Sequence, residues 1–164
     1  MERLQGRLRV DQTPEFSVFV FALLLNYPWE LIQAPLFEGM AAAPHWEAVK
    51  VCTRATFGDG IIMLIAFWAV AVAVRSRRWL LNPRAWQVAA FIAVGVLITI
   101  VLEHFATRSS HPLWGWEYSS LMPTLPVLGT GLTPLLQWIM LPGLVLWFSR
   151  RQFAGAGKRG DKSR

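Results

Sequence analysis

The sequence is poor in the residues that form disulfides and metal centres. Only one of its 164 residues, Cys52, is a cysteine, which excludes a disulfide within the chain and the CxxC centre of a thiol oxidoreductase. The three histidines, His45, His104 and His111, belong to no HExxH or ExxH motif, which disfavours zinc hydrolase chemistry. They are also too few to ligate several haems in pairs. We therefore predict no metal ligands, and the sequence leaves any cofactor unknown.

Charge is almost absent from long stretches of the chain. The residues are 54% hydrophobic and the mean hydropathy is +0.39, which is more apolar than a soluble domain of this size. The net charge of +6 comes from Lys and Arg residues that flank apolar runs, as in membrane proteins. A nucleic-acid-binding surface would interleave basic and aromatic residues. We therefore expect a membrane protein with lipids as neighbours and no nucleic acid partner.

The apolar residues form runs of the length that crosses a membrane. A transmembrane helix needs about 20 mostly apolar residues, and the sequence contains four such runs, at 16–37, 57–74, 86–106 and 127–148. Residues 1–15 are polar, and the first run lacks a small-residue cleavage site, so we expect it to remain in the mature protein. The fold class predicted is an all-α integral membrane protein. Residues 1–150 form a single bundle of four transmembrane helices, and 151–164, rich in Gly, Lys and Arg, form a disordered basic tail.

The distribution of Lys and Arg predicts the direction of the helices. The N-terminal arm contains three such residues, the first loop (38–56) two, the second loop (75–85) four, the third loop (107–126) one and the tail six. Cytoplasmic loops of membrane proteins are enriched in Lys and Arg. The alternation of high and low counts predicts a multi-pass protein of the cell membrane with both termini in the cytoplasm.

The polar residues inside the apolar runs are the candidates for a functional site. A charged group at the bilayer centre costs about 2.5 to 3.5 kcal/mol on insertion scales, so it tends to face the interior of the bundle. In the first run Asn26, Glu30 and Gln33 are spaced i, i+4 and i+7, which places them on one helical face. The other runs contribute Asp59, then Thr99, Glu103 and His104, and finally Thr133 and Gln137. With the predicted directions, all these groups lie in the outer half of the membrane and form an outward-opening polar pocket.

The two loops on the outer side of this pocket also have informative sequences. The third loop, between the third and fourth helices, contains Trp114, Trp116 and Tyr118. A loop of about 19 residues is usually functional or disordered, and this one is too aromatic to be disordered, so we expect it to fold back as a lid or to anchor at the headgroups. In the first loop, apolar residues recur at helical spacing over 46–53, which predicts a short helix on the membrane surface.

The residues of the predicted pocket suit acid–base catalysis on a lipophilic molecule. A carboxyl group in apolar surroundings holds its proton more readily, which favours Glu30 as a proton donor. Asp59 or Glu103, nearer to water and to cations, would then be the ionised partner. His104 is the remaining candidate for acid–base work. The ligand would be bound by Asn26, Trp29, Gln33, Trp114, Trp116, Tyr118 and Gln137. The rings of the tryptophans would stabilise a cationic intermediate.

This equipment suits isomerisation, hydration or cyclisation of an isoprenoid-like or other lipophilic molecule. The arrangement resembles that of small polytopic enzymes of isoprenoid and sterol metabolism, which also place acidic and aromatic residues in a cavity among helices. The resemblance is one of arrangement and includes no shared motif. A second class stays open: a non-catalytic membrane protein that binds a small ligand, an ion or a partner subunit. The absence of an internal repeat argues against a transporter built from inverted repeats in one chain, although a homo-oligomer would supply a second half.

Overall fold

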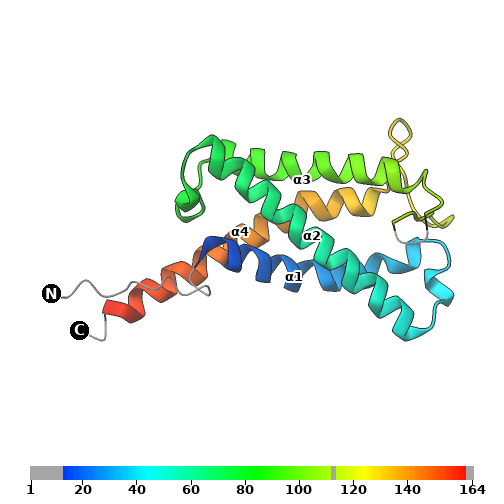
Figure 1. Ribbon diagram of the computed structural model, residues 1–164, viewed down its shortest axis with the longest axis horizontal. Coiled ribbons are helices and arrows are strands. Elements are labelled where there is room, and N and C mark those ends of the chain that lie inside the picture. The colour runs from blue at the N-terminus through cyan, green and yellow to red at the C-terminus, as the bar shows by residue number, and fades with distance from the viewer. Residues whose placement is uncertain (1–12, 112–113, 162–164) are drawn as a thin grey trace.

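The computed structural model describes residues 13–111 and 114–161, and this part of the chain contains helices and no strand. Four helices are long and apolar enough to cross a membrane, which confirms the four long apolar helices predicted. The elements are α1 (Pro14–Gln33), η2 (Ala34–Leu36), η3 (Met40–Ala42), α2 (His45–Ala73), η4 (Arg77–Leu81), α3 (Ala85–Ala106) and α4 (Leu132–Asp161), where η denotes a short 3₁₀ helix (Figure 1).

The helices form an antiparallel bundle in which α1 and α3 each pack against both α2 and α4. The connections 34–44 and 107–131 lie together at one end of the bundle, which we name the loop end (Figure 1). The start of α1, the connection 74–84 and the second half of α4 lie toward the opposite end, which we name the terminal end. Consecutive helices therefore run in opposite directions, and each connection joins two helix ends that lie at the same end of the bundle.

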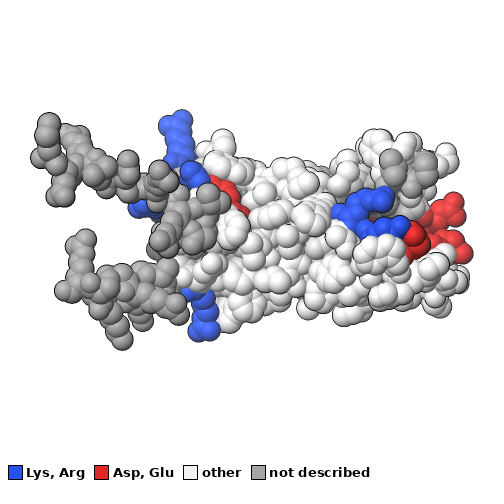
Figure 2. All heavy atoms as spheres, turned by 60° about the horizontal axis from the view of Figure 1, so that its bottom comes forward, with Lys and Arg blue, Asp and Glu red and all other residues white. Residues whose placement is uncertain are grey.

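The surface between the two ends is apolar. Figure 2 shows a broad band without charged side chains that separates charged groups at the loop end from those at the terminal end. Large apolar side chains are exposed on every helix, for example Leu24, Val72, Leu97 and Leu144. A soluble protein seldom exposes a continuous apolar surface of this kind, whereas lipid chains would cover it.

The interior changes in character along the bundle. Toward the terminal end the core is apolar: the Trp79 ring, only 4% exposed, packs between Phe67 and Phe91 at centroid distances of 5.6 and 5.8 Å. Further along, Gly95 of α3 faces the ring of Trp138 on α4, and a Cβ atom at Gly95 would overlap that ring. Glycine at this position therefore allows α3 and α4 to approach closely. Asn26, Glu30 and Gln33 of α1 and Gln137 of α4, which are also buried, lie nearer the loop end.

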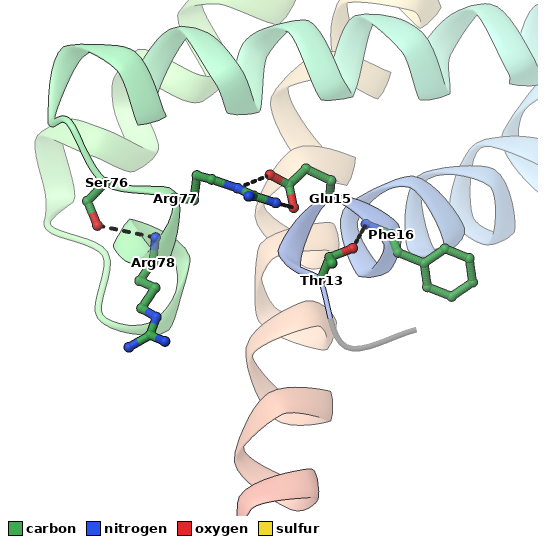
Figure 3. A network of polar contacts seen from close by, with 6 residues as sticks. All are labelled: Thr13, Glu15, Phe16, Ser76, Arg77 and Arg78. Carbon is green, nitrogen blue, oxygen red and sulfur yellow. Dashed lines mark hydrogen bonds and ion pairs between the residues drawn. The ribbon is translucent and has the colours of Figure 1, made fainter. Parts of the chain in front are cut away.

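An ion pair joins the first helix to the connection 74–84 at the terminal end (Figure 3). The Arg77 guanidinium donates two hydrogen bonds to the Glu15 carboxylate, at 2.6 and 2.8 Å, and lies 5.3 Å from the Trp68 ring centroid. Nearby, the Thr13 hydroxyl caps α1 by accepting a hydrogen bond from the Phe16 N–H. The start of α1 is thereby fixed relative to α2 and η4.

Two helix starts predicted from hydropathy are wrong. α2 begins at His45, after Pro44, and not at residue 57. Its first three turns carry charges, such as the pair Glu47–Lys50 at 2.7 Å. Their hydropathy is therefore low although they are part of the helix. The predicted short surface helix at 46–53 is the beginning of α2.

α4 begins at Leu132 and not at residue 127. Residues 127–131 begin with Val127 and Leu128 and carry no charge, but they belong to a turn closed by the bridge between Thr124 and Gly131. Gly129 has a positive φ of 65° in this turn, which is a backbone conformation that glycine adopts without strain. At its other end α4 continues to Asp161, through most of the segment predicted to be a disordered tail; residues 162–164 lie outside the described part.

Candidate functional site

Gln137 of α4 is the centre of a buried polar network that joins three helices. Its side chain is 2% exposed. The amide nitrogen donates to Asn26 Oδ1 at 2.7 Å and to Glu30 Oε1 at 3.0 Å, both on α1, and to Asp59 Oδ2 of α2 at 2.8 Å. The amide oxygen accepts a hydrogen bond from Gln33 Nε2 at 3.2 Å. One side chain of α4 therefore holds polar groups of α1 and α2 together.

The Trp29 indole N–H determines which way the side-chain amides of the network are turned. An indole N–H only donates, and that of Trp29 lies 3.2 Å from Gln33 Oε1. Gln33 consequently turns its NH₂ group toward Glu30 Oε1, at 2.8 Å, and toward Gln137 Oε1. Asn26 fits the same scheme because its Nδ2 donates to a backbone carbonyl one turn earlier at 2.7 Å. The NH₂ group of Gln137 must then face the carboxyl groups.

The carboxyl groups of Glu30 and Asp59 form a pair. Both accept a hydrogen bond from the same Gln137 nitrogen, at 3.0 and 2.8 Å, so they lie next to each other. Two adjacent carboxylates repel each other strongly, and this repulsion is relieved when one of the two groups carries a hydrogen. The arrangement therefore suits a pair that holds one proton and can give or take it.

A cavity of about 500 Å³ adjoins the pair. Glu30, Asp59 and Gln137 line it together with apolar and aromatic side chains from α2, α3, α4 and both connections of the loop end. Val51 of α2 and Leu102 of α3 also line it and are 44% and 45% exposed. The cavity therefore borders the apolar outer surface of α2 and α3 as well as the polar loop end.

Glu103 of α3 occupies another wall of the cavity and is bound by the aromatic loop. Trp116 Nε1 donates to Glu103 Oε2 at 3.2 Å, and the Tyr118 hydroxyl donates to the same oxygen. The Gly131 N–H donates to the Tyr118 oxygen at 2.9 Å. The Phe37 ring packs against both aromatic rings, with centroids 6.4 Å from Trp116 and 5.7 Å from Tyr118. This carboxyl group is thus held apart from the Glu30–Asp59 pair by its own donors.

Residues 114–131, which we name the cover loop, are fastened to the connection 34–44. The Glu38 N–H donates to the Glu117 carbonyl, and the Ser119 N–H donates to the Leu36 carbonyl, both at 2.9 Å. The Trp116 N–H donates to the last carbonyl of α3, at Ala106, at 3.3 Å. Trp114, Gly115, Trp116 and Glu117 line the cavity. The loop therefore covers the cavity at the loop end.

Burial and the adjacent Glu103 carboxyl group raise the pKa of Tyr118 above its ordinary value of 10.0. A phenol with a raised pKa keeps its hydrogen at every pH at which membrane proteins are usually handled. The bond from Tyr118 to Glu103 is accordingly permanent in that range.

The structure brings most of the predicted site residues together but separates some. Asn26 and Trp29 do not line the cavity, and they act on it through Gln137 and Gln33. Tyr118 acts through Glu103. The prediction that His104 belongs to the pocket does not agree with the structure: its side chain is exposed, and its Nδ1 lies 2.9 Å from Arg108 Nη1. Adjacent residues on a helix differ by about 100° in direction, so Glu103 and His104 cannot share a face.

Sequence reasoning missed several residues of the cavity wall. Glu38 and Glu117 line it from two loops, and Cys52 of α2 lies there with its Sγ 3.6 Å from the Glu30 carbonyl. Loop residues have no periodicity that predicts their direction, so no sequence signal could have placed the two glutamates. Arg54 of α2 also lines the cavity.

Within residues 13–111 and 114–161, no group of three or more His, Cys, Asp and Glu side chains is arranged to hold a metal ion. Comparison of the chain with protein-family models, curated proteins and solved structures gives no match. The proposals below therefore depend on the geometry of the site alone.

Proposed function

We propose that the protein is an integral membrane protein that binds a lipophilic small molecule in the cavity and exchanges a proton with it through Glu30 and Asp59. The observation that carries this proposal is the pair of carboxyl groups that share the Gln137 amide on the wall of a largely apolar cavity. Ionisable groups among apolar helices are costly to insert and usually mark functional sites. Amides or hydroxyls would suffice to hold the helices together.

The walls of the cavity favour a lipophilic ligand. Its lining is mostly apolar, and the exposed side chain of Leu102 extends it to the surface of α3 that lipid chains would contact. A molecule dissolved in the bilayer would enter between α2 and α3 without crossing water. The cover loop closes the loop end, which excludes water from the carboxyl pair and strengthens its electrostatic interactions.

The two carboxyl groups suit a reaction that begins with protonation of carbon. One group transfers its proton to one carbon of an alkene, which leaves a cation on the other carbon. The ionised group removes a proton from the carbon next to that cation, which moves the double bond and returns one proton to the pair. Attack on the cation by water or by a second alkene, followed by transfer of a proton to the ionised group, gives hydration or cyclisation. An isoprenoid-like molecule is a suitable substrate for each. Glu30 is the proton donor in this proposal: Gln33 and Gln137 both donate to its Oε1, which leaves Oε2 to carry the hydrogen.

We propose that the terminal end faces the cytoplasm. Six arginines lie there in the described part of the chain: Arg75, Arg77, Arg78, Arg84, Arg150 and Arg151. The loop end has basic and acidic groups in similar number. A reporter that is active only in the cytoplasm should therefore be active when fused at the C-terminus and silent when inserted beside Val127, which is 93% exposed at a turn of the cover loop. Activity at both positions would contradict four spans with cytoplasmic ends.

The proton exchange is tested by deuterium labelling. Wild-type protein in lipid nanodiscs is incubated in D₂O with the lipophilic molecules that co-purify with it, and their masses are compared with those from empty nanodiscs. A carboxyl group that protonates carbon leaves deuterium there, and this label survives return to H₂O. We expect one molecule to be enriched by the protein and to gain one or more mass units, with at least a hundredfold slower labelling in Glu30→Gln, which preserves size and hydrogen bonding.

Glu47→Gln is the matched control because Glu47 is exposed at the same end, paired with Lys50, and outside the cavity wall. Equal labelling by wild type and Glu30→Gln would refute the catalytic role of Glu30. An enriched molecule that wild type leaves unlabelled would favour the alternative, a non-catalytic binding protein. No enriched molecule at all would refute binding in the cavity.

A further inference from the structure

The charges around the cavity are mostly of one sign. Among the residues that the structure describes, five carboxyl groups line it, from Glu30, Glu38, Asp59, Glu103 and Glu117, against a single guanidinium, that of Arg54. A cavity for a phosphate or carboxylate headgroup requires the opposite balance. A cavity for an uncharged lipid requires no excess of charged groups of either sign. The surplus of carboxyl groups favours a ligand that carries positive charge.

The aromatic lining favours the same kind of ligand. Phe37, Trp114, Trp116 and Trp138 contribute to the walls. The face of an aromatic ring carries negative potential and attracts cations, indole most strongly, and ammonium groups are recognised by cages of such rings. Combined with carboxyl groups, these rings would hold a cation whose substituents are apolar.

The oxygens around the Gln137 nitrogen outnumber its hydrogens, which is a separate observation. The Gln137 NH₂ group has two hydrogens, but three oxygens lie within 3.0 Å of its nitrogen. Buried polar groups are normally satisfied. A ligand that brings a positive centre would complete the interactions of these oxygens.

We infer that the cavity recognises a positive centre on a lipophilic ligand. This inference rests on the proposed function and specifies its ligand. The positive centre has two possible sources: an ammonium group that the ligand carries permanently, or the carbocation that forms when an alkene is protonated in the site. In both cases the carboxyl pair and the rings bind the charged species more tightly than an uncharged one of the same shape.

The test uses two probes of one shape. Benzyltrimethylammonium has a permanent charge, and neopentylbenzene is its uncharged counterpart with carbon in place of nitrogen. Binding of each to the protein in nanodiscs is measured through the fluorescence of the cavity tryptophans, with empty nanodiscs subtracted. We expect the cation to bind at least tenfold more tightly than the uncharged probe, and to release about one proton on binding, measured by calorimetry in buffers of different ionisation enthalpy.

Two variants test whether the carboxyl pair causes the preference for the cationic probe. Asp59→Asn should weaken binding of the cation at least tenfold and leave the uncharged probe within twofold, whereas Glu47→Gln should change neither. Equal binding of both probes by the wild type would overturn the inference while leaving lipophile binding intact, and an identical effect of the two variants would overturn the role of the pair. If neither probe binds, the inference fails, and the co-purification experiment decides the proposed function on its own.

The labelling experiment distinguishes the two sources. If the cation probe binds and also inhibits deuterium labelling of the co-purifying molecule, the positive centre is the transient carbocation. If the probe binds and displaces a co-purifying amine that never acquires label, the positive centre is a resident ammonium group, and the catalytic part of the proposed function fails while this inference holds.

Discussion

The Gln137→Leu substitution should destabilise the bundle more than any other single change in the polar network. Leucine has a similar volume but offers no hydrogen bond to Asn26, Glu30, Asp59 or Gln33, all of which contact Gln137 in the structure. Hydrogen bonds between membrane helices contribute on average about 0.6 kcal/mol each. Four of them, with two carboxyl groups left without a donor from α4, correspond to a loss of about 2 to 4 kcal/mol.

The loss is measured as the free energy of unfolding in mixed detergent micelles, with helicity as the readout. Gln152→Leu is the control, because the same change is made on the same helix at an exposed position; its effect should stay within about 0.5 kcal/mol, as is usual for surface substitutions. A Gln137→Leu variant as stable as the control would mean that the network does not hold α4 to α1 and α2. The same variant should also abolish the preference for the cationic probe, since the carboxyl pair loses its orientation.

The sequence predicted which residues share a helical face but not which atoms meet across helices. The spacing of Asn26, Glu30 and Gln33 places them on one face because helical periodicity is a local property. That all of them converge on Gln137 depends on the rotation and depth of α4 relative to α1, which are set by packing. Gln137 therefore looked like one polar residue among several, and its central position is visible only in the structure.

Local charge and composition misled the assignment of helix ends for a physical reason. The first turns of α2 are exposed at the loop end, so they tolerate Glu47, Lys50 and Arg54 while remaining helical. Hydropathy detects the part of a helix that is suited to lipid, and this part is shorter than the helix. Residues 127–131 present the opposite case, since they carry no charge but form a turn stabilised by Gly129.

Glu103 and His104 show that the sequence does not determine which of two adjacent helical residues faces the interior. The sequence requires that only one of them faces the interior, and it does not say which. The cover loop decides, because Trp116 and Tyr118 offer two hydrogen-bond donors to a carboxyl group at position 103. His104 is paired with Arg108, one turn later on the outside. Contacts between a loop and a helix far apart in sequence have no periodic signature.

The second large effect that we expect is on the cover loop, in the variant Tyr118→Phe. Phenylalanine keeps the ring that packs against Phe37 but removes the hydroxyl that donates to Glu103 and accepts from the Gly131 N–H. A buried carboxyl group and a backbone N–H then each lose a partner, which costs about 1 to 3 kcal/mol per group. The loss at either group alone corresponds to an increase of roughly 5- to 150-fold in the rate at which the loop opens, because the loss falls on the closed state.

Hydrogen–deuterium exchange of the backbone amides measures this opening. In Tyr118→Phe, exchange should accelerate at residues 114–119 and 131 and remain unchanged in the middle of α2. Tyr27→Phe is the matched control, because Tyr27 is the other tyrosine of the chain and lies on α1 outside the cavity wall. Unchanged exchange in the loop would show that packing of the rings alone holds it closed.

The same bond predicts how the cover loop responds to pH. Because the pKa of Tyr118 is raised in the folded protein, the phenol contributes its full stabilisation below a pH of about 10, the ordinary pKa of tyrosine. The contribution is lost only as the pH rises through the raised value in the folded state. Exchange at 114–119 in the wild type should therefore keep its protection factor between pH 7 and 9. A protection factor that falls within that interval would mean that the phenol ionises there and that its hydrogen is not what joins the loop to Glu103.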